Sequence, residues 1–173
     1  MNKVLVIVDY QKDFVDGMMG NPAAREIETA ICRKIEEYQA SGDDLIFLMD
    51  THEEADICSR EFEFSQRLHC VQDTEGWNIY GKVADYVPQA NYVIRKNCYG
   101  SAELADVLRQ NRYEVVELAG VTTHSCVLSN AIIAAAAVPH GQIIVDSACT
   151  ASANQAQKEA SLETLRGLHI QVR

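Results

Sequence analysis

Short, uninterrupted apolar runs alternate along this chain with segments whose apolar residues recur at helical spacing. The runs that predict strands fall at residues 4–8, 45–49, 93–96, 114–119, 142–146 and 169–172. The segments that predict helices fall at residues 23–40, 102–111, 126–137 and 154–165. Strands without polar alternation are buried on both faces, which requires helices on both sides of a parallel sheet. We therefore expect an α/β, three-layer, doubly wound fold with a mostly parallel sheet of about six strands.

Length and charge narrow the class of protein. A chain of 173 residues with 47% hydrophobic residues predicts one domain, residues 1–173, with a substantial core. The apolar run after Cys126 is shorter than the ~20 residues that cross a bilayer, so no membrane partner is expected. Residues 1–3 lead directly into a strand without a signal-peptide pattern, which predicts a cytoplasmic location. The net charge of −10 argues against a nucleic-acid partner.

The six cysteines form no CxxC pair, which indicates free thiols in a reducing compartment. Cys126 follows a buried strand and the polar connection at residues 120–125, at the predicted start of a helix. A thiol in the first turn of a helix faces unpaired N–H groups and the positive end of the helix dipole. Both lower its pKa and favour the nucleophilic thiolate. The alternative is a small buried core residue, which is common for a free cysteine.

Two further reactive side chains stand at strand ends. Asp9 closes the first strand and Lys96 closes the third. An open parallel sheet gathers the carboxyl ends of its strands into one crevice, so Asp9, Lys96 and Cys126 could meet there. Taken alone, Asp9 could hold a metal or cap a turn, and Lys96 could extend from the sheet edge into solvent. The phosphate-binding glycine motifs that often accompany a strand-end aspartate are absent.

A second group follows the second strand. Asp50 and His52 stand two residues apart, and His69 lies downstream. This set of one oxygen and two nitrogen donors suits zinc, iron or manganese, and Glu61 or Glu63 could supply another oxygen. Two alternatives remain open at this point: Cys58 and Cys70 could form a thiolate-rich zinc site, or the histidines could be solvated loop residues.

Five ordered motifs together resemble the isochorismatase-like cysteine hydrolases, most closely their nicotinamidase (pyrazinamidase) branch. The first, Asp9-Tyr10-Gln11-Lys12-Asp13-Phe14, resembles D-x-Q-x-D-F, and residues 96–102 resemble K-x-x-Y-S-A-F with an added glycine. Residues 120–127 resemble G-V-x-T-D-x-C-V. Residues 50–52 and 69–76 resemble the metal segment, D-x-H and H-C-V-x-G-T-x-G. The match runs nearly from end to end.

The resemblance implies amide hydrolysis of nicotinamide to nicotinate through a thioester. It assigns Asp9, Lys96 and Cys126 as a catalytic triad. It also implies a cis peptide between Val121 and Thr122, with the N–H groups of Thr122 and Cys126 as an oxyanion hole. Phe14 and Tyr99 are expected to bind the substrate ring.

The resemblance further implies one divalent metal ion, zinc first and iron or manganese as alternatives. Its expected ligands are Asp50, His52 and His69, with Glu61 as the fourth and Glu63 as the fallback. Relatives suggest a homo-oligomer, either a dimer or a tetramer.

Three departures from the family pattern bear on specificity. His124 replaces the usual aspartate, Asp73 replaces a glycine, and Arg67 and Leu68 stand where an aromatic residue normally precedes His69; Phe64 could substitute for it. The alternatives are therefore a family amidase acting on a ureido acid or small amide, an isochorismatase, or a catalytically silent interaction module.

Overall fold

The computed structural model describes residues 2–173, except the side chains of residues 57 and 58. Its sheet has six strands in the order β3-β2-β1-β4-β5-β6, and every neighbouring pair is parallel. The strands are β1 (Lys3–Val8), β2 (Asp44–Asp50), β3 (Tyr92–Lys96), β4 (Val115–Val121), β5 (Gln142–Ala151) and β6 (Gln171–Val172). The predicted α/β fold is therefore confirmed.

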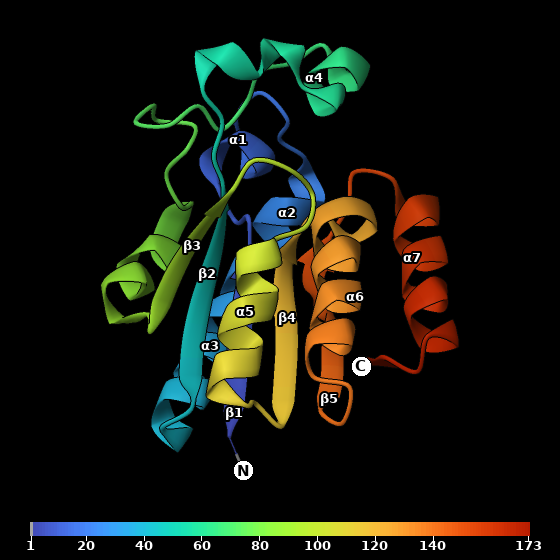
Figure 1. Cartoon of the computed structure of the whole chain (residues 1–173). Helices are drawn as coiled ribbons and strands as arrows, with labels where there is room; N and C mark the ends of the chain where they lie inside the picture. Colours follow the sequence, from blue (N-terminus) through green and yellow to red (C-terminus); the bar gives the residue numbers. More distant parts are fainter. Residues whose placement is uncertain (1) are drawn as a thin grey trace.

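Helices cover both faces of the sheet (Figure 1). One face carries α5 (Ala102–Asn111), α6 (Leu128–Ala137) and α7 (Gln155–Gly167), and the other carries α1 (Lys12–Val15), α2 (Pro22–Glu26), α3 (Glu28–Ser41) and the 3₁₀ segment η2 (Gly81–Gln89). The central strand β1 supplies both cores, because Val4 and Val6 pack with the first layer and Leu5 and Ile7 with the second. Among residues 2–173, no helix is both long and apolar enough to cross a bilayer.

The single helix predicted over residues 23–40 is wrong in one respect, because the structure contains two. Helix α2 ends at Glu26, and α3 begins at Glu28. Ile27 lies between them with φ −88° and ψ −5°. The break lets Ala24 of α2 and Ile31 of α3 reach the same buried cluster, so tertiary packing overrides a continuous helical pattern.

The polar stretch between β2 and β3 carries short helices of its own. The 3₁₀ segment η1 (Glu54–Cys58) and α4 (Arg60–Ser65) lie above the carboxyl end of the sheet (Figure 1). An isolated bridge joins His52 to Val71 within this stretch, and a second ties the stretch to the core by joining Ile79 to Gln11. The segment therefore forms a cover over the end of the sheet where the expected site residues gather.

The connection before Cys126 differs from the prediction. Strand β4 continues to Val121, and Cys126 lies in a π-helical turn, η3 (Thr123–Val127), rather than in the first turn of α6. The peptide between Val121 and Thr122 is cis, as expected. Gly120 has a φ of 119°, and an added Cβ would lie 2.1 Å from the Val8 carbonyl oxygen. Only glycine permits β4 to approach β1 so closely beside Asp9.

Candidate active site and metal centre

Three charged side chains stand at the carboxyl end of adjacent strands. Asp50 is the last residue of β2 and Lys96 the last of β3, and the parallel register places them directly beside each other. Asp9 follows β1 with a φ of 48°, in the left-handed region that non-glycine residues seldom occupy. Backbone strain of this kind is often found at functional sites. The topology thus concentrates charge at one point below the cover.

Lys96 is the centre of the first group. Its Nζ lies 2.7 Å from Asp9 Oδ2, 3.1 Å from Asp50 Oδ1 and 3.7 Å from Cys126 Sγ. Asp9 and the Cys126 thiol also influence each other electrostatically. All four residues are buried. The structure therefore brings together the three residues expected to form a triad, and adds a contact between Lys96 and Asp50 that the sequence did not suggest.

Burial determines the protonation of this group. It raises the pKa of Cys126 well above its usual value, with the charge of Lys96 opposing the shift. The lowered thiol pKa expected from a helix start is therefore wrong, because removal from water outweighs the position near the helix. Burial also raises the pKa of Asp9 to about 6, again opposed by Lys96. At neutral pH the thiol is protonated and Asp9 is an ionised acceptor beside it.

The second group consists of Asp50, His52, Glu61 and His69. One potential ligand atom from each lies within 4.8 Å of the others. The Nε2 atoms of His52 and His69 lie 3.1 and 3.2 Å from Asp50 Oδ2, and His69 Nε2 lies 3.6 Å from Glu61 Oε1. The structure thus selects Glu61 over Glu63 as the fourth member.

The outer nitrogens of both histidines already have acceptors. His52 Nδ1 faces Asp56 Oδ2 at 3.3 Å, and His69 Nδ1 faces the Arg67 carbonyl oxygen at 2.9 Å. These contacts place the proton on Nδ1 and leave each Nε2 lone pair directed at the centre of the group, a common arrangement around protein-bound metals. His69 Nε2 is buried without a hydrogen-bond partner. The residues therefore fit a divalent ion.

The thiolate-rich alternative is not supported. The Cys58 side chain lies outside the described residues, and Cys70 is not a member of the group. Burial raises the pKa of Cys70 far above its ordinary value, so its thiol stays protonated. Among the side chains that the structure describes, nitrogen and oxygen donors alone form the candidate metal centre.

Two supporting residues were not predicted. Gln11 is fully buried, donates from Nε2 to the Asp50 and Trp77 carbonyl oxygens, and accepts the Asp50 N–H, each at 2.8 Å. Asp13 Oδ2 accepts the Cys70 N–H at 2.8 Å, next to His69. Both residues belong to the first motif, where polar residues at every second position after Asp9 could have indicated their role. Gln11 holds the backbone of Asp50, and Asp13 holds the backbone next to His69.

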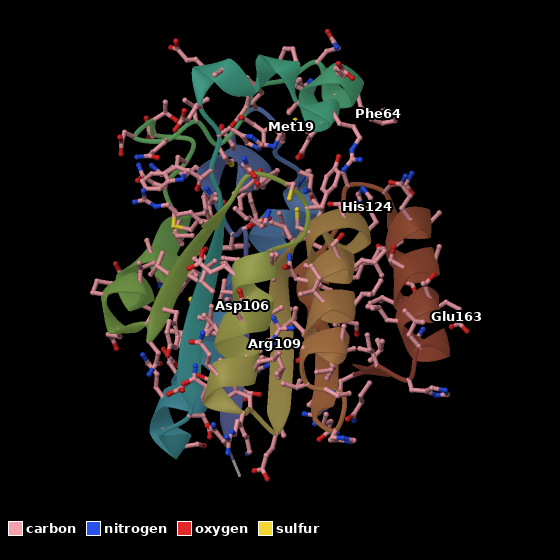
Figure 2. The ribbon with its side chains drawn as sticks, viewed as in Figure 1. Met19, Phe64, Asp106, Arg109, His124 and Glu163 are labelled. Atoms are coloured by element: carbon pink, nitrogen blue, oxygen red, sulfur yellow. The ribbon has the colours of Figure 1, made fainter. Side chains whose placement is uncertain are left out.

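A cavity of about 420 Å³ opens onto Cys126, with Phe14, His69, Tyr99 and Thr122 among its lining residues. The Phe14 ring packs edge-on against His69 with centroids 5.2 Å apart. Tyr99 is 39% exposed. Figure 2 shows Phe64 on α4 and His124 below it near the carboxyl end of the sheet, and both also line the cavity. A small molecule can reach the thiol between aromatic walls.

Comparisons with known proteins agree with this geometry. The isochorismatase domain model matches residues 3–172. The uncharacterized isochorismatase family protein PncA of Bacillus subtilis (strain 168) is 33% identical over 147 residues, which is 76% of this chain and 78% of the relative.

Solved structures give the same result. The pyrazinamidase/nicotinamidase of Streptococcus mutans UA159 is 30% identical, with a TM-score of 0.89 over 99% of this chain and 100% of that one. The pyrazinamidase of Pyrococcus horikoshii, solved in complex with zinc, is 24% identical. Its TM-score is 0.88 over 100% of this chain and 99% of that one. At that identity the second structure supports the fold alone.

Proposed function

The chain belongs to the isochorismatase family and is an amide-hydrolysing enzyme, and on this premise we propose that it converts nicotinamide to nicotinate and ammonia. The observation that carries the proposal is the buried contact of Lys96 with both Asp9 and Cys126 at the floor of a cavity beside the candidate metal centre. A nucleophile, a base and a cation in one contact group are the parts that covalent hydrolysis requires.

In the first half of the proposed reaction, Asp9 accepts the proton of the Cys126 thiol. The thiolate sulfur then attacks the carboxamide carbon, and the carbonyl electrons move to oxygen. We assign the N–H groups of Thr122 and Cys126 to this oxyanion; losing one such donor typically costs ~10²–10³ in rate. The C–N bond breaks as Asp9 returns the proton to nitrogen, so ammonia leaves and a thioester remains on Cys126.

In the second half, Asp9 removes a proton from water, and the hydroxide oxygen attacks the thioester carbon. The C–S bond breaks, the acid is released, and the proton held by Asp9 returns to the sulfur. The ammonium of Lys96 stays charged, since its carboxylate neighbours and Cys126 raise its pKa even though burial opposes this. Its role is to orient Asp9 and to stabilise negative charge on either neighbour.

Asp50, His52, Glu61 and His69 would hold a divalent ion, zinc as the first candidate and iron or manganese as alternatives. Such an ion would supply a Lewis-acidic anchor for a ring nitrogen. Phe14 and Tyr99 would confine the ring against the candidate metal centre and direct its carboxamide to Cys126. A cytoplasmic location and a dimeric or tetrameric assembly remain predictions.

Ammonia release tests the proposal. Purified protein should release ammonia from nicotinamide faster than from N-carbamoyl amino acids, because the cavity offers aromatic walls to a flat ring. Faster release from the N-carbamoyl compounds would favour the ureido-acid amidase. No release from any amide, with Cys126 still alkylated readily, would refute the assigned chemistry and favour the interaction module.

A further inference from the structure

Two hydrogen-bond donors in the cavity of Cys126 have no part in the proposed chemistry: the amide of Asn21 and the guanidinium of Arg67. Asn21 is 5% exposed and caps helix α2, where its Oδ1 accepts the Ala24 N–H at 3.0 Å. This bond fixes the orientation of the amide. The other atom, Nδ2, is buried and has no hydrogen-bond partner. An unpartnered buried donor is costly, so it points to an acceptor supplied by a ligand.

Arg67 contributes a charge to the same region. Its only hydrogen bond from the guanidinium is a long one, from Nη1 to the Met18 carbonyl oxygen at 3.4 Å, and it forms no ion pair among the described residues. Met18 precedes Asn21 by three residues, so this contact keeps the guanidinium near the segment that carries the free amide. A fork of N–H donors beside a further N–H donor matches the oxygens of a carboxylate.

The remaining charges of the cavity do not oppose an anion at this position. Glu61 is the acidic residue among the lining side chains, and it belongs to the candidate metal centre. The positive charge of Lys96 is already balanced by Asp9 and Asp50. His124, which stands where the resemblance predicted an aspartate, donates to or accepts from Ser152 Oγ at 2.7 Å and adds no negative charge. Arg67 is therefore the uncompensated cation at the cavity.

We propose that Asn21 and Arg67 form a carboxylate subsite, so that the enzyme also hydrolyses small primary amides with a carboxylate at their far end. The proposal rests on the proposed amide hydrolysis and extends its substrate class beyond nicotinamide. It also accounts for Arg67 at a place where the resemblance predicted an aromatic residue. The amide group would lie at Cys126 and the anionic end at the subsite.

Two variants separate binding from folding. Asn21→Asp keeps the cap of α2, because aspartate caps helices as well as asparagine, but it replaces the free donor by a negative charge. Arg67→Gln removes the charge and keeps a polar side chain of similar reach. Arg33→Gln is the matched control, because the Arg33 side chain is 74% exposed on α3 and, within residues 2–173 as described, pairs only with Glu37.

Ammonia release is measured for malonamate, succinamate and glutaramate, each against its methyl ester, which has the same chain without the charge. We expect the best acid to exceed its ester by about tenfold in kcat/KM, the effect of one charge-assisted hydrogen bond. Arg67→Gln and Asn21→Asp should each remove the preference, and Arg33→Gln should keep it. Equal rates for acid and ester, or a preference that survives both variants, would overturn the subsite.

A second readout does not depend on amide hydrolysis. The rates at which iodoacetate and iodoacetamide alkylate Cys126 are compared, since the two reagents differ in charge. We expect the ratio of anionic to neutral reagent to fall in both subsite variants and to stay constant in Arg33→Gln. If this ratio falls in both variants but no amide releases ammonia, the proposed hydrolysis is refuted and the subsite is supported. A ratio unchanged by either variant refutes the subsite itself.

Discussion

Two lysine–aspartate–cysteine groups occur among the described residues, and only one has the surroundings of an active site. The first is Lys96 with Asp9 and Cys126. The second lies under α3, where Lys34 contacts Asp146 at 2.7 Å and Glu117 at 2.6 Å, and the charge of Asp146 acts on Cys149. In both groups burial raises the pKa of the thiol, to about 12 for Cys149.

The groups differ in what surrounds them. Both carboxylate oxygens of Glu117 accept a hydrogen bond, one from Lys34 and one from the Tyr38 hydroxyl at 2.7 Å. Cys149 is 1% exposed and does not line the cavity of Cys126. The second group also borders a cavity, of about 270 Å³, but Cys149 does not line it. Cys126 instead lines its own cavity, together with an unpartnered donor and part of the candidate metal centre. Side-chain identity therefore does not mark an active site; a thiol that lines a cavity and unmet polar groups do.

The largest expected effect distinguishes the two thiols. Cys126→Ala should lower amide hydrolysis by about 10⁴-fold or more, because the nucleophile is lost, while the protein stays folded. Cys149→Ala should keep kcat/KM within about twofold, since this thiol contacts no substrate. Activity assays with circular dichroism check both. Iodoacetamide should label Cys126 well before Cys149, and the reverse order would invalidate the comparison.

The next effect tests whether the first group acts as a unit. Asp9→Asn and Lys96→Ala should each reduce kcat by about 10²–10⁴-fold, because each disables proton transfer at Cys126. The double variant should be little worse than the worse single variant, since residues that act together give non-additive losses. Steady-state kinetics on all four proteins gives the result. Losses that multiply would mean that the two residues act independently.

The second group should matter for stability instead. Glu117→Gln removes one partner of a buried ion pair and should lower the free energy of unfolding by about 3 kcal/mol. Urea denaturation measures this loss. The activity of the folded variant should stay within about twofold of the wild type, because Glu117 lies outside the cavity of Cys126. A large loss of kcat without a loss of stability would assign Glu117 a role in catalysis.

Loss of the metal centre should affect binding more than chemistry. His52→Ala should abolish metal retention, seen by elemental analysis, and raise KM for nicotinamide by about 10–100-fold, because a ligand and its anchoring contact are removed. Cys126 should remain reactive toward iodoacetamide in this variant. If metal-free protein hydrolyses nicotinamide with an unchanged KM, the metal has no part in binding the substrate.

The smallest effect is on pH dependence. Asp9 must be ionised to accept a proton and its pKa is raised to about 6, so kcat/KM should fall by up to about tenfold per unit below that pH. In the second group, burial acts to raise the pKa of Asp146 but Lys34 outweighs it, so this pKa is lowered. Its stabilising contribution is present above its unfolded value near 4 and is lost only as pH falls further.

Activity should therefore disappear at a higher pH than the fold. A pH series of activity, metal content and melting temperature checks this order. Coincident loss of activity and structure would remove the distinction between the two groups.

The sequence predicted the sheet and the first group because each depends on local pattern. Asp9 and Asp50 directly follow apolar runs and Lys96 ends the third predicted strand, and a parallel sheet gathers such ends. Asp146 also follows an apolar run but does not join the site. Strand β5 continues to Ala151 through an irregularity in its pairing with β4, so Asp146 lies within the strand. A pairing irregularity depends on the neighbouring strand and is not visible in a single run of residues.

The features that the sequence did not reveal depend on contacts between distant segments. The Lys96–Asp50 contact results from the register of two strands, and the support given by Gln11 requires the long segment after β2 to return to the first helix. The thiol pKa was misjudged for the same reason, because burial is a property of the assembled core. Local pattern identified the reactive groups, and tertiary structure determined their electrostatics.

The strand order also has a consequence for synthesis on the ribosome. Strand β1 is made first, yet one of its two neighbours, β4, begins only at Val115. A nascent chain that has emerged as far as α5 can pair β1 with β2 and β2 with β3 but leaves the other edge of β1 open and apolar, a state prone to aggregation. Cys126 lies in the turn η3, which follows β4. The proposed nucleophile therefore emerges only after the strand that covers this edge of β1, and the proposed activity cannot arise before that edge is covered.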